Sequence, residues 1–150
     1  MPLEKEFVEI EQLIQKYEAH NTDISAKGVD WHLDHMLKVI LQVSKALKNS
    51  DPSEYKASFN FLRNVIFITK TIPRGKARSP KSVIPPDAIS KDDLVHQLEL
   101  AKKSMLLIEN LDAKSNFKHP YFNMLNLKQT LKFLKIHTVH HLKICRDIIK

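Results

Sequence analysis

Two histidines lie on the apolar face of the C-terminal segment 126–150, four residues apart. The residues of this face recur every three or four positions, as on one side of an α-helix. They are Leu127, Leu131, Leu134, His137, His141, Ile144 and Ile148. Imidazoles at i and i+4 lie on the same side of a helix and can direct two nitrogen atoms at one point. A lone histidine on such a face is usually a hydrogen-bonded core residue, but this pair favours metal ligation. We therefore interpret His137 and His141 as two ligands of a metal ion.

A third ligand is available near the start of the second predicted helix. His32 and His35 both flank the apolar positions Met36 and Val39, so periodicity alone does not choose between them. Three protein nitrogens with open coordination positions are typical of a catalytic metal centre. Imidazole ligands suit Zn²⁺ or Ni²⁺ best, with iron or manganese as further options. The sequence thus predicts a three-histidine site for a divalent metal.

Two more histidines are predicted to lie around this site. His140 is about 100° round the helix from His141, so it cannot easily share the same target. We interpret it as an outer group that supports a ligand, or as a surface residue. His119 precedes Pro120 in a predicted loop and is a candidate for the substrate side of the site or for contact with a ligand.

The elements that position these residues are predicted to be helices. Asn126 and Gln129 form a capping box at the start of the last helix. Ser90 is a second predicted N-cap, and Asp51-Pro-Ser-Glu54 predicts the start of another helix. The predicted helices cover 3–20, 30–49, 51–70, 90–108 and 126–150, with Asp30 as the N-cap of the second. The second and third are predicted to pack as antiparallel neighbours. Segments 71–89 and 112–125 are predicted to be irregular.

The composition is that of one globular domain covering residues 1–150. Hydrophobic residues make up 43% and charged residues 27% of the chain. Only two glycines occur, which disfavours a sheet-rich fold with many tight turns. We predict an all-α fold: a four-helix bundle with a long crossover at 71–89 and one additional short helix or irregular segment. The absence of a membrane-length apolar run and of an N-terminal apolar region predicts a soluble, cytoplasmic protein.

The formal net charge of +7 suggests a role in attracting anions or nucleic acid. No basic cluster with interleaved aromatic residues occurs, so a solvated basic surface is the preferred interpretation. Arg74, Lys76 and Arg78 in the crossover either hold an anionic co-substrate or are simply solvated. The single Cys145 excludes an intramolecular disulfide and is predicted to be an inert buried thiol.

Three short motifs resemble the DinB-like (YfiT-like) superfamily of metal-binding four-helix-bundle proteins. They are Trp31-His-Leu-Asp-His-Met-Leu-Lys-Val-Ile40, His119-Pro-Tyr-Phe122 and His137-Thr-Val-His-His-Leu142. In that superfamily one histidine of the second helix and an HxxxH pair of the last helix hold a divalent metal. The resemblance places these ligands on His35, His137 and His141, with His32 as the alternative in the second helix. The His-Pro-Tyr-Phe segment is similar to one branch of the superfamily.

The resemblance implies a metal-dependent enzyme that acts on a small molecule. The two activities it implies are a thiol-dependent transferase, with a low-molecular-weight thiol as cofactor, and a hydrolase. It also implies a homodimer. The sequence offers no general base beside the metal, since Asp34 points about 100° away from His35 on the helix. The alternative is a non-catalytic metal-binding or stress-related helical bundle. The positive charge alone suggests a nucleic-acid-associated protein.

Overall fold

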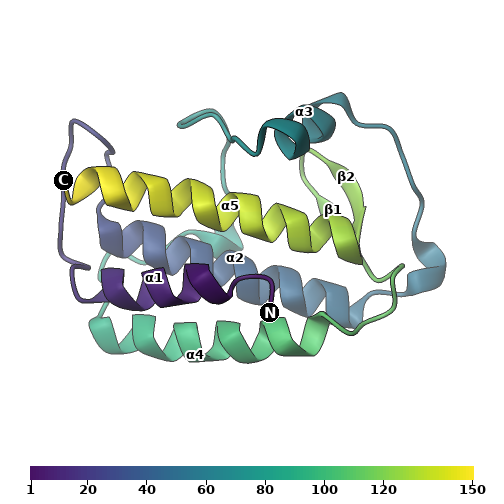
Figure 1. Cartoon of the computed structure of the whole chain (residues 1–150), viewed down its shortest axis with the longest axis horizontal. Coiled ribbons are helices and arrows are strands. Elements are labelled where there is room, and N and C mark those ends of the chain that lie inside the picture. Colours follow the sequence, from purple (N-terminus) through teal and green to yellow (C-terminus); the bar gives the residue numbers. More distant parts are fainter.

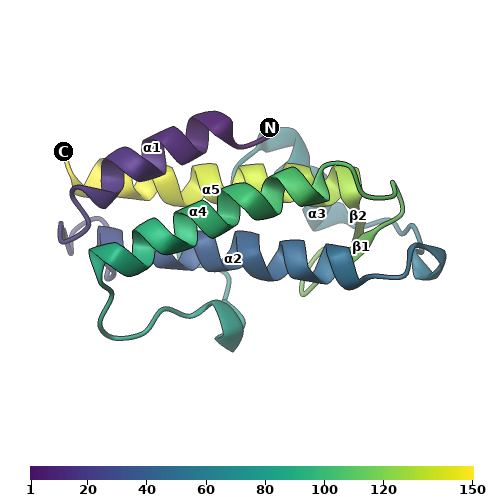
Figure 2. The same cartoon turned by 90° about the horizontal axis from the view of Figure 1, so that it is seen from below.

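Four helices lie side by side around a shared core in the computed structural model, which describes residues 1–150 (Figures 1 and 2). A fifth, shorter helix and a β-hairpin lie together at one end. The helices are α1 (Glu4–Ile14), α2 (Val29–Asn49), α3 (Phe61–Thr69), α4 (Lys91–Ile108) and α5 (Leu127–Ile148). The strands are β1 (Asn116–His119) and β2 (Asn123–Asn126), and two 3₁₀ turns cover Pro52–Glu54 and Lys81–Val83. The predicted helical class is therefore confirmed, apart from the hairpin.

The starts of α4 and α5 agree with their sequence signals. The Ser90 side chain accepts a hydrogen bond from the Asp93 backbone N–H, 3.1 Å away. Asn126 and Gln129 form the complete capping box, each side chain accepting from the other residue's backbone N–H. These caps satisfy N–H groups that have no partner within the helix. The predicted apolar face of α4 is buried throughout: Leu94, Leu98, Ala101, Met105 and Ile108.

The first two helices differ from the prediction at one end each. α1 ends at Ile14, so the predicted helix to His20 is too long. The N-cap of α2 is Gly28, not Asp30. A Cβ at Gly28 would lie 2.5 Å from His20 Nε2, so the exposed His20 ring would have to move to make room for a larger residue.

The predicted helix over 51–70 is wrong in its first half. Asp51 caps only the 3₁₀ turn, and its carboxylate accepts from the Ser53 N–H. Residues 55–60 have no regular structure, and α3 begins at Phe61 with Asn60 as its N-cap. α3 packs against α5 and not as an antiparallel neighbour of α2.

The β-hairpin replaces the irregular segment that was predicted at 112–125. It pairs β1 with β2 antiparallel, from Asn116 opposite Asn126 to His119 opposite Asn123. The three-residue loop between them is followed by Asn123 with a φ of 61°, a left-handed conformation that is common in such loops. The all-α prediction is therefore wrong in this segment, and the loop places aromatic side chains beside α5.

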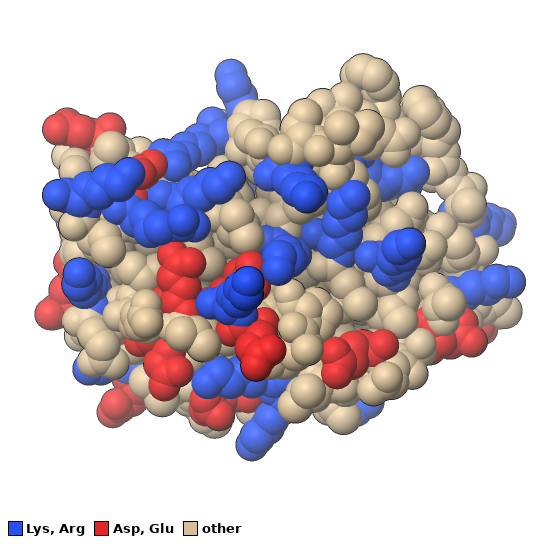
Figure 3. Space-filling model, viewed as in Figure 1, with Lys and Arg blue, Asp and Glu red and all other residues tan.

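Charged side chains are unevenly distributed on the surface. On the face in Figure 3, Lys and Arg gather along the half that contains α5, while Asp and Glu concentrate over α1 and α4. None of the helices combines the length and apolar character that crossing a membrane would require.

Candidate metal centre

Three histidines from α2 and α5 meet in the interior. His35, His137 and His141 each offer a ligand atom, and these atoms all lie within 4.8 Å of one another. Two nitrogens bound to one zinc ion at about 2.1 Å each can be no more than about 4.2 Å apart. Any two of these nitrogens that lie as far as 4.8 Å apart would therefore have to move closer together to bind zinc. The three-histidine cluster predicted from the sequence is thus close enough to hold a metal ion.

The ring nitrogens of this cluster are suited to a metal. His35 Nδ1 donates a hydrogen bond to the backbone carbonyl of Val83, 2.8 Å away, which leaves Nε2 with its lone pair. Such a bond fixes the tautomer of a ligating histidine. His137 Nδ1 is the only fully enclosed imidazole nitrogen that lacks a hydrogen-bond partner. An unpaired buried polar atom is costly, and a metal ion bound through His137 Nδ1 would give this nitrogen a partner.

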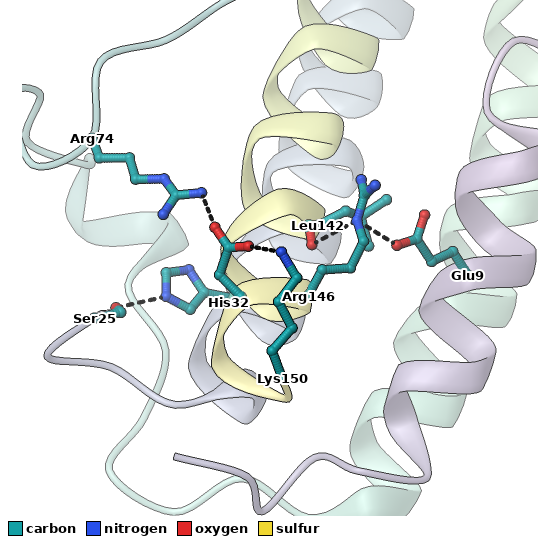
Figure 4. A network of polar contacts seen from close by, with 8 residues as sticks. Glu9, Ser25, His32, Arg74, Leu142, Arg146 and Lys150 are labelled. Atoms are coloured by element: carbon teal, nitrogen blue, oxygen red, sulfur yellow. Dashed lines mark hydrogen bonds and ion pairs between the residues drawn. The ribbon is translucent and has the colours of Figure 1, made fainter. Parts of the chain in front are cut away.

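His32 contacts the cluster through a hydrogen bond and is not one of the three residues. Its Nδ1 lies 2.9 Å from His141 Nδ1, and its Nε2 lies 3.0 Å from Ser25 Oγ (Figure 4). If His141 binds a metal through Nε2, its Nδ1–H donates to His32, and His32 in turn donates to Ser25. This chain of contacts supports the choice of His35 over His32 as the ligand from α2.

Burial keeps these imidazoles neutral. Loss of hydration lowers the pKa of His32 to about 4, and the nearby His35 contributes to the shift. The pKa values of His137 and His141 are well below the usual 6.5, again mainly through burial and then through neighbouring histidines. The pKa of His35 is also lowered by burial. Because only a neutral imidazole binds a metal, protons compete weakly for this cluster at neutral pH.

The surroundings hold the rings in place without adding another ligand. The Trp31 indole stacks on His35 with ring centroids 4.9 Å apart. His140 packs edge-on against His141 at 4.9 Å and lies outside the cluster, as its helical position predicts. Its pKa is lowered to about 4 by burial and by nearby Arg74 and Lys143.

A cavity of about 320 Å³ opens beside the cluster. His35 and His137 lie in its wall, and α2, α3, α5, the hairpin and the crossover 71–89 all contribute residues. The volume is at the lower end of the range for small-molecule sites. A metal bound by the three histidines would therefore lie at the edge of a space for a small ligand.

His119 lies in the cavity wall with a defined tautomer. Its Nδ1 accepts hydrogen bonds from the backbone N–H groups of Tyr121 and Phe122, at 3.0 and 3.2 Å. The neutral ring must then carry its proton on Nε2. Burial lowers the pKa of His119 to about 4, so this tautomer is a neutral hydrogen-bond donor at physiological pH. The predicted substrate-side placement of His119 is consistent with this position.

The three basic residues of the crossover have different surroundings. Arg74 forms an ion pair with Asp147 of α5 at 2.8 Å (Figure 4), so this guanidinium is already paired. Lys76 and Arg78 line the cavity and have no ion-pair partner. An anion-binding role for this loop is thus better placed on Lys76 and Arg78 than on Arg74.

Two other reactive groups are not part of the cluster. Cys145 is fully buried, and burial raises the pKa of its thiol to about 12, in agreement with the predicted inert thiol. Asp34 forms an ion pair with Lys38 at 2.6 Å and accepts a hydrogen bond from Gln97. The carboxylate adjacent to His35 in sequence is therefore engaged with α4.

Sequence reasoning missed several contributors to the site. The Val83 carbonyl belongs to the backbone, so its side chain gives no sign of this contact, and Ser25 lies between the first two predicted helices. Phe117, Phe122 and Phe133 line the cavity, but their convergence depends on the unpredicted hairpin. The aromatic residues around His119 were the only available signal.

Replacement of His32 by leucine should weaken Zn²⁺ binding about 10- to 100-fold, because such losses follow when the hydrogen-bond partner of a ligand is removed. Stoichiometry should stay at one ion per chain. Competition titration with a chromophoric chelator would measure both quantities. The matched control is Ser25→Ala, which removes only the outer contact and should have the smaller effect. Complete loss of Zn²⁺ in the leucine variant would instead make His32 a ligand.

No protein-family model, curated protein or solved structure matches the chain. The resemblance to DinB-like proteins therefore rests on the short sequence motifs alone.

Proposed function

We propose that this protein is a divalent-metal-dependent enzyme of the DinB-like type that acts on a small molecule, as a hydrolase or a thiol-dependent transferase. The observation that supports this most is the position of the three-histidine cluster at the wall of a cavity. A purely structural metal site usually has four protein ligands and no open position. Here three histidines converge, and two of them face a space large enough for a ligand.

The residues have distinct roles in this proposal. His35, His137 and His141 would hold Zn²⁺ or Ni²⁺, with iron or manganese as alternatives. A divalent ion bound by neutral ligands lowers the pKa of a water or thiol at an open position, which supplies a nucleophile near neutral pH. His119 would donate a hydrogen bond from Nε2 to an electronegative atom of the substrate. The aromatic side chains of the wall would exclude water around that substrate.

The alternative is a metal-binding protein without turnover, and one observation favours it. The cavity is lined by no Asp or Glu. Among the histidines of its wall, the His119 tautomer donates a hydrogen bond and does not accept a proton. A hydrolase that lacks a general base depends on the metal alone to generate its nucleophile.

Turnover by metal-loaded protein separates these two functions. The assays would follow hydrolysis of 4-nitrophenyl esters, and conjugation of an aryl chloride with and without a small thiol. We expect one of these rates to be proportional to the bound Zn²⁺, to disappear after chelation and to return on reloading. His137→Ala should show only the background rate of buffer. Full metal occupancy without turnover in either assay would favour the non-catalytic alternative.

A further inference from the structure

The cavity beside the histidines has an unbalanced charge. Of its 22 lining residues, Lys76 and Arg78 are the only ones with a fixed charge, and both are positive. Both are exposed, so they lie at the rim, whereas His35 lies in the interior. Neither side chain forms an ion pair. Two uncompensated cations at the mouth of a low-dielectric space attract anions.

The inner wall is apolar and aromatic. Val39, Ile66, Val83, Phe122 and Phe133 are all buried and all line the cavity. The Phe133 ring meets the Phe122 ring edge-on at 6.1 Å. Burial of the apolar surface of a ligand against this wall is favourable. An aromatic ligand also makes edge and face contacts with the phenylalanine rings. A hydrated inorganic anion would gain none of this.

We propose that the cavity binds a small organic anion: an aromatic or similarly apolar body that fills the inner wall, with a carboxylate that pairs with Lys76 and Arg78 at the rim. Arg78 would supply a fork of N–H donors that matches a carboxylate, and Lys76 a second positive charge. The volume of about 320 Å³ limits this ligand to the small end of the usual range.

This inference names the substrate class of the proposed enzyme and in that respect rests on the proposed function. Binding of the anion, however, uses rim and wall residues that are not among the three histidines. It can therefore be measured on metal-free and on Zn²⁺-loaded protein separately.

The probe is 2-naphthoate, measured by isothermal titration calorimetry against its neutral analogue 2-naphthalenemethanol and against acetate. We expect one naphthoate site per chain, with affinity that falls as salt is raised. The neutral analogue should bind about tenfold more weakly, because it forms no charge-assisted hydrogen bond. Acetate should give no measurable heat, since it lacks the apolar body.

Exposed positions allow variants that leave the core intact. Lys76→Gln/Arg78→Gln should weaken naphthoate binding about tenfold and remove most of its salt dependence. The matched control is Lys81→Gln, an exposed cation of the same crossover that does not line the cavity. Ala77→Trp, which places a bulky ring at the exposed rim, should block the site. Equal affinity for both naphthalene probes, or an unchanged affinity in the double variant, would overturn the proposal.

Metal content measured on the same samples separates the two proposals. Naphthoate binding that requires Lys76 and Arg78 in a protein that takes up no Zn²⁺ supports the anion site and contradicts the metal enzyme. Stoichiometric Zn²⁺ without selective naphthoate binding contradicts the anion site alone.

Discussion

Protein reconstituted with Zn²⁺ and then desalted should retain one ion per chain, whereas His137→Ala and His141→Ala should retain none. Each variant leaves only two imidazoles in the cluster. Protein zinc sites usually have at least three protein ligands, so the ion should be lost during desalting. Elemental analysis of untagged protein gives the ratio directly. Bound Zn²⁺ should also raise the thermal midpoint of the wild type and leave that of both variants unchanged.

Two other histidines provide the controls for this experiment. His140→Ala should retain most of the metal, because His140 packs beside His141 but lies outside the cluster. His96→Ala changes an exposed histidine on α4 and should behave as wild type. If His140→Ala lost as much Zn²⁺ as His137→Ala, the ligand set would have to include a residue that faces a different side of α5.

The α5 half of the site was predictable because its determinants are local. The apolar period of α5 fixes which residues share a face, and a separation of four residues brings His137 and His141 together on any regular helix. The Asn126–Gln129 capping box sets where that helix begins. None of these features requires knowledge of how α5 packs against the rest of the chain.

The ligand that α2 contributes could not be identified in the same way. His32 and His35 are three residues apart, so both point toward the same side of the helix. The distinction between ligand and supporting residue comes from contacts distant in sequence. Val83 accepts from His35, and Ser25 and His141 contact His32. The sequence pattern of α2 contains none of this information.

The error at 51–70 has a tertiary cause. Two backbone groups of 51–60, which a helix would have used internally, are instead bonded to the hairpin. Asn116 donates to the Asp51 carbonyl, and the Lys56 N–H lies 3.3 Å from the Met124 sulfur. The buried Arg63 guanidinium donates to the carbonyls of Ser58 and Phe122, which ties α3 to the same hairpin. Asp51 is therefore the N-cap of only a 3₁₀ turn, because contacts with residues distant in sequence outweigh the local preference for a helix.

The metal-free protein should lose stability steeply as the pH falls from about 6.5 to 4. His32, His119 and His140 have folded-state pKa values near 4, below the usual 6.5. Between these values the unfolded chain binds more protons than the folded one, so the free energy of unfolding decreases as the pH is lowered. One such histidine accounts for on the order of 3 kcal/mol between pH 7 and pH 4. Urea titrations of apo protein at several pH values would measure this slope.

The change of stability with pH can be compared between wild type and variants. This comparison separates the protonation of the buried imidazoles from the other effects of a substitution. His32→Asn should destabilise the protein at pH 7 through its lost contacts, yet its stability should fall less between pH 7 and pH 4, because one buried group no longer has to be protonated. His96→Asn, which removes an exposed imidazole on α4, is the matched control for the substitution. Saturating Zn²⁺ should stabilise the folded state most near pH 7 and progressively less in acid, since protons and metal compete for the same nitrogens. A stability that stays constant from pH 7 to pH 4.5 would show that burial does not keep these imidazoles neutral.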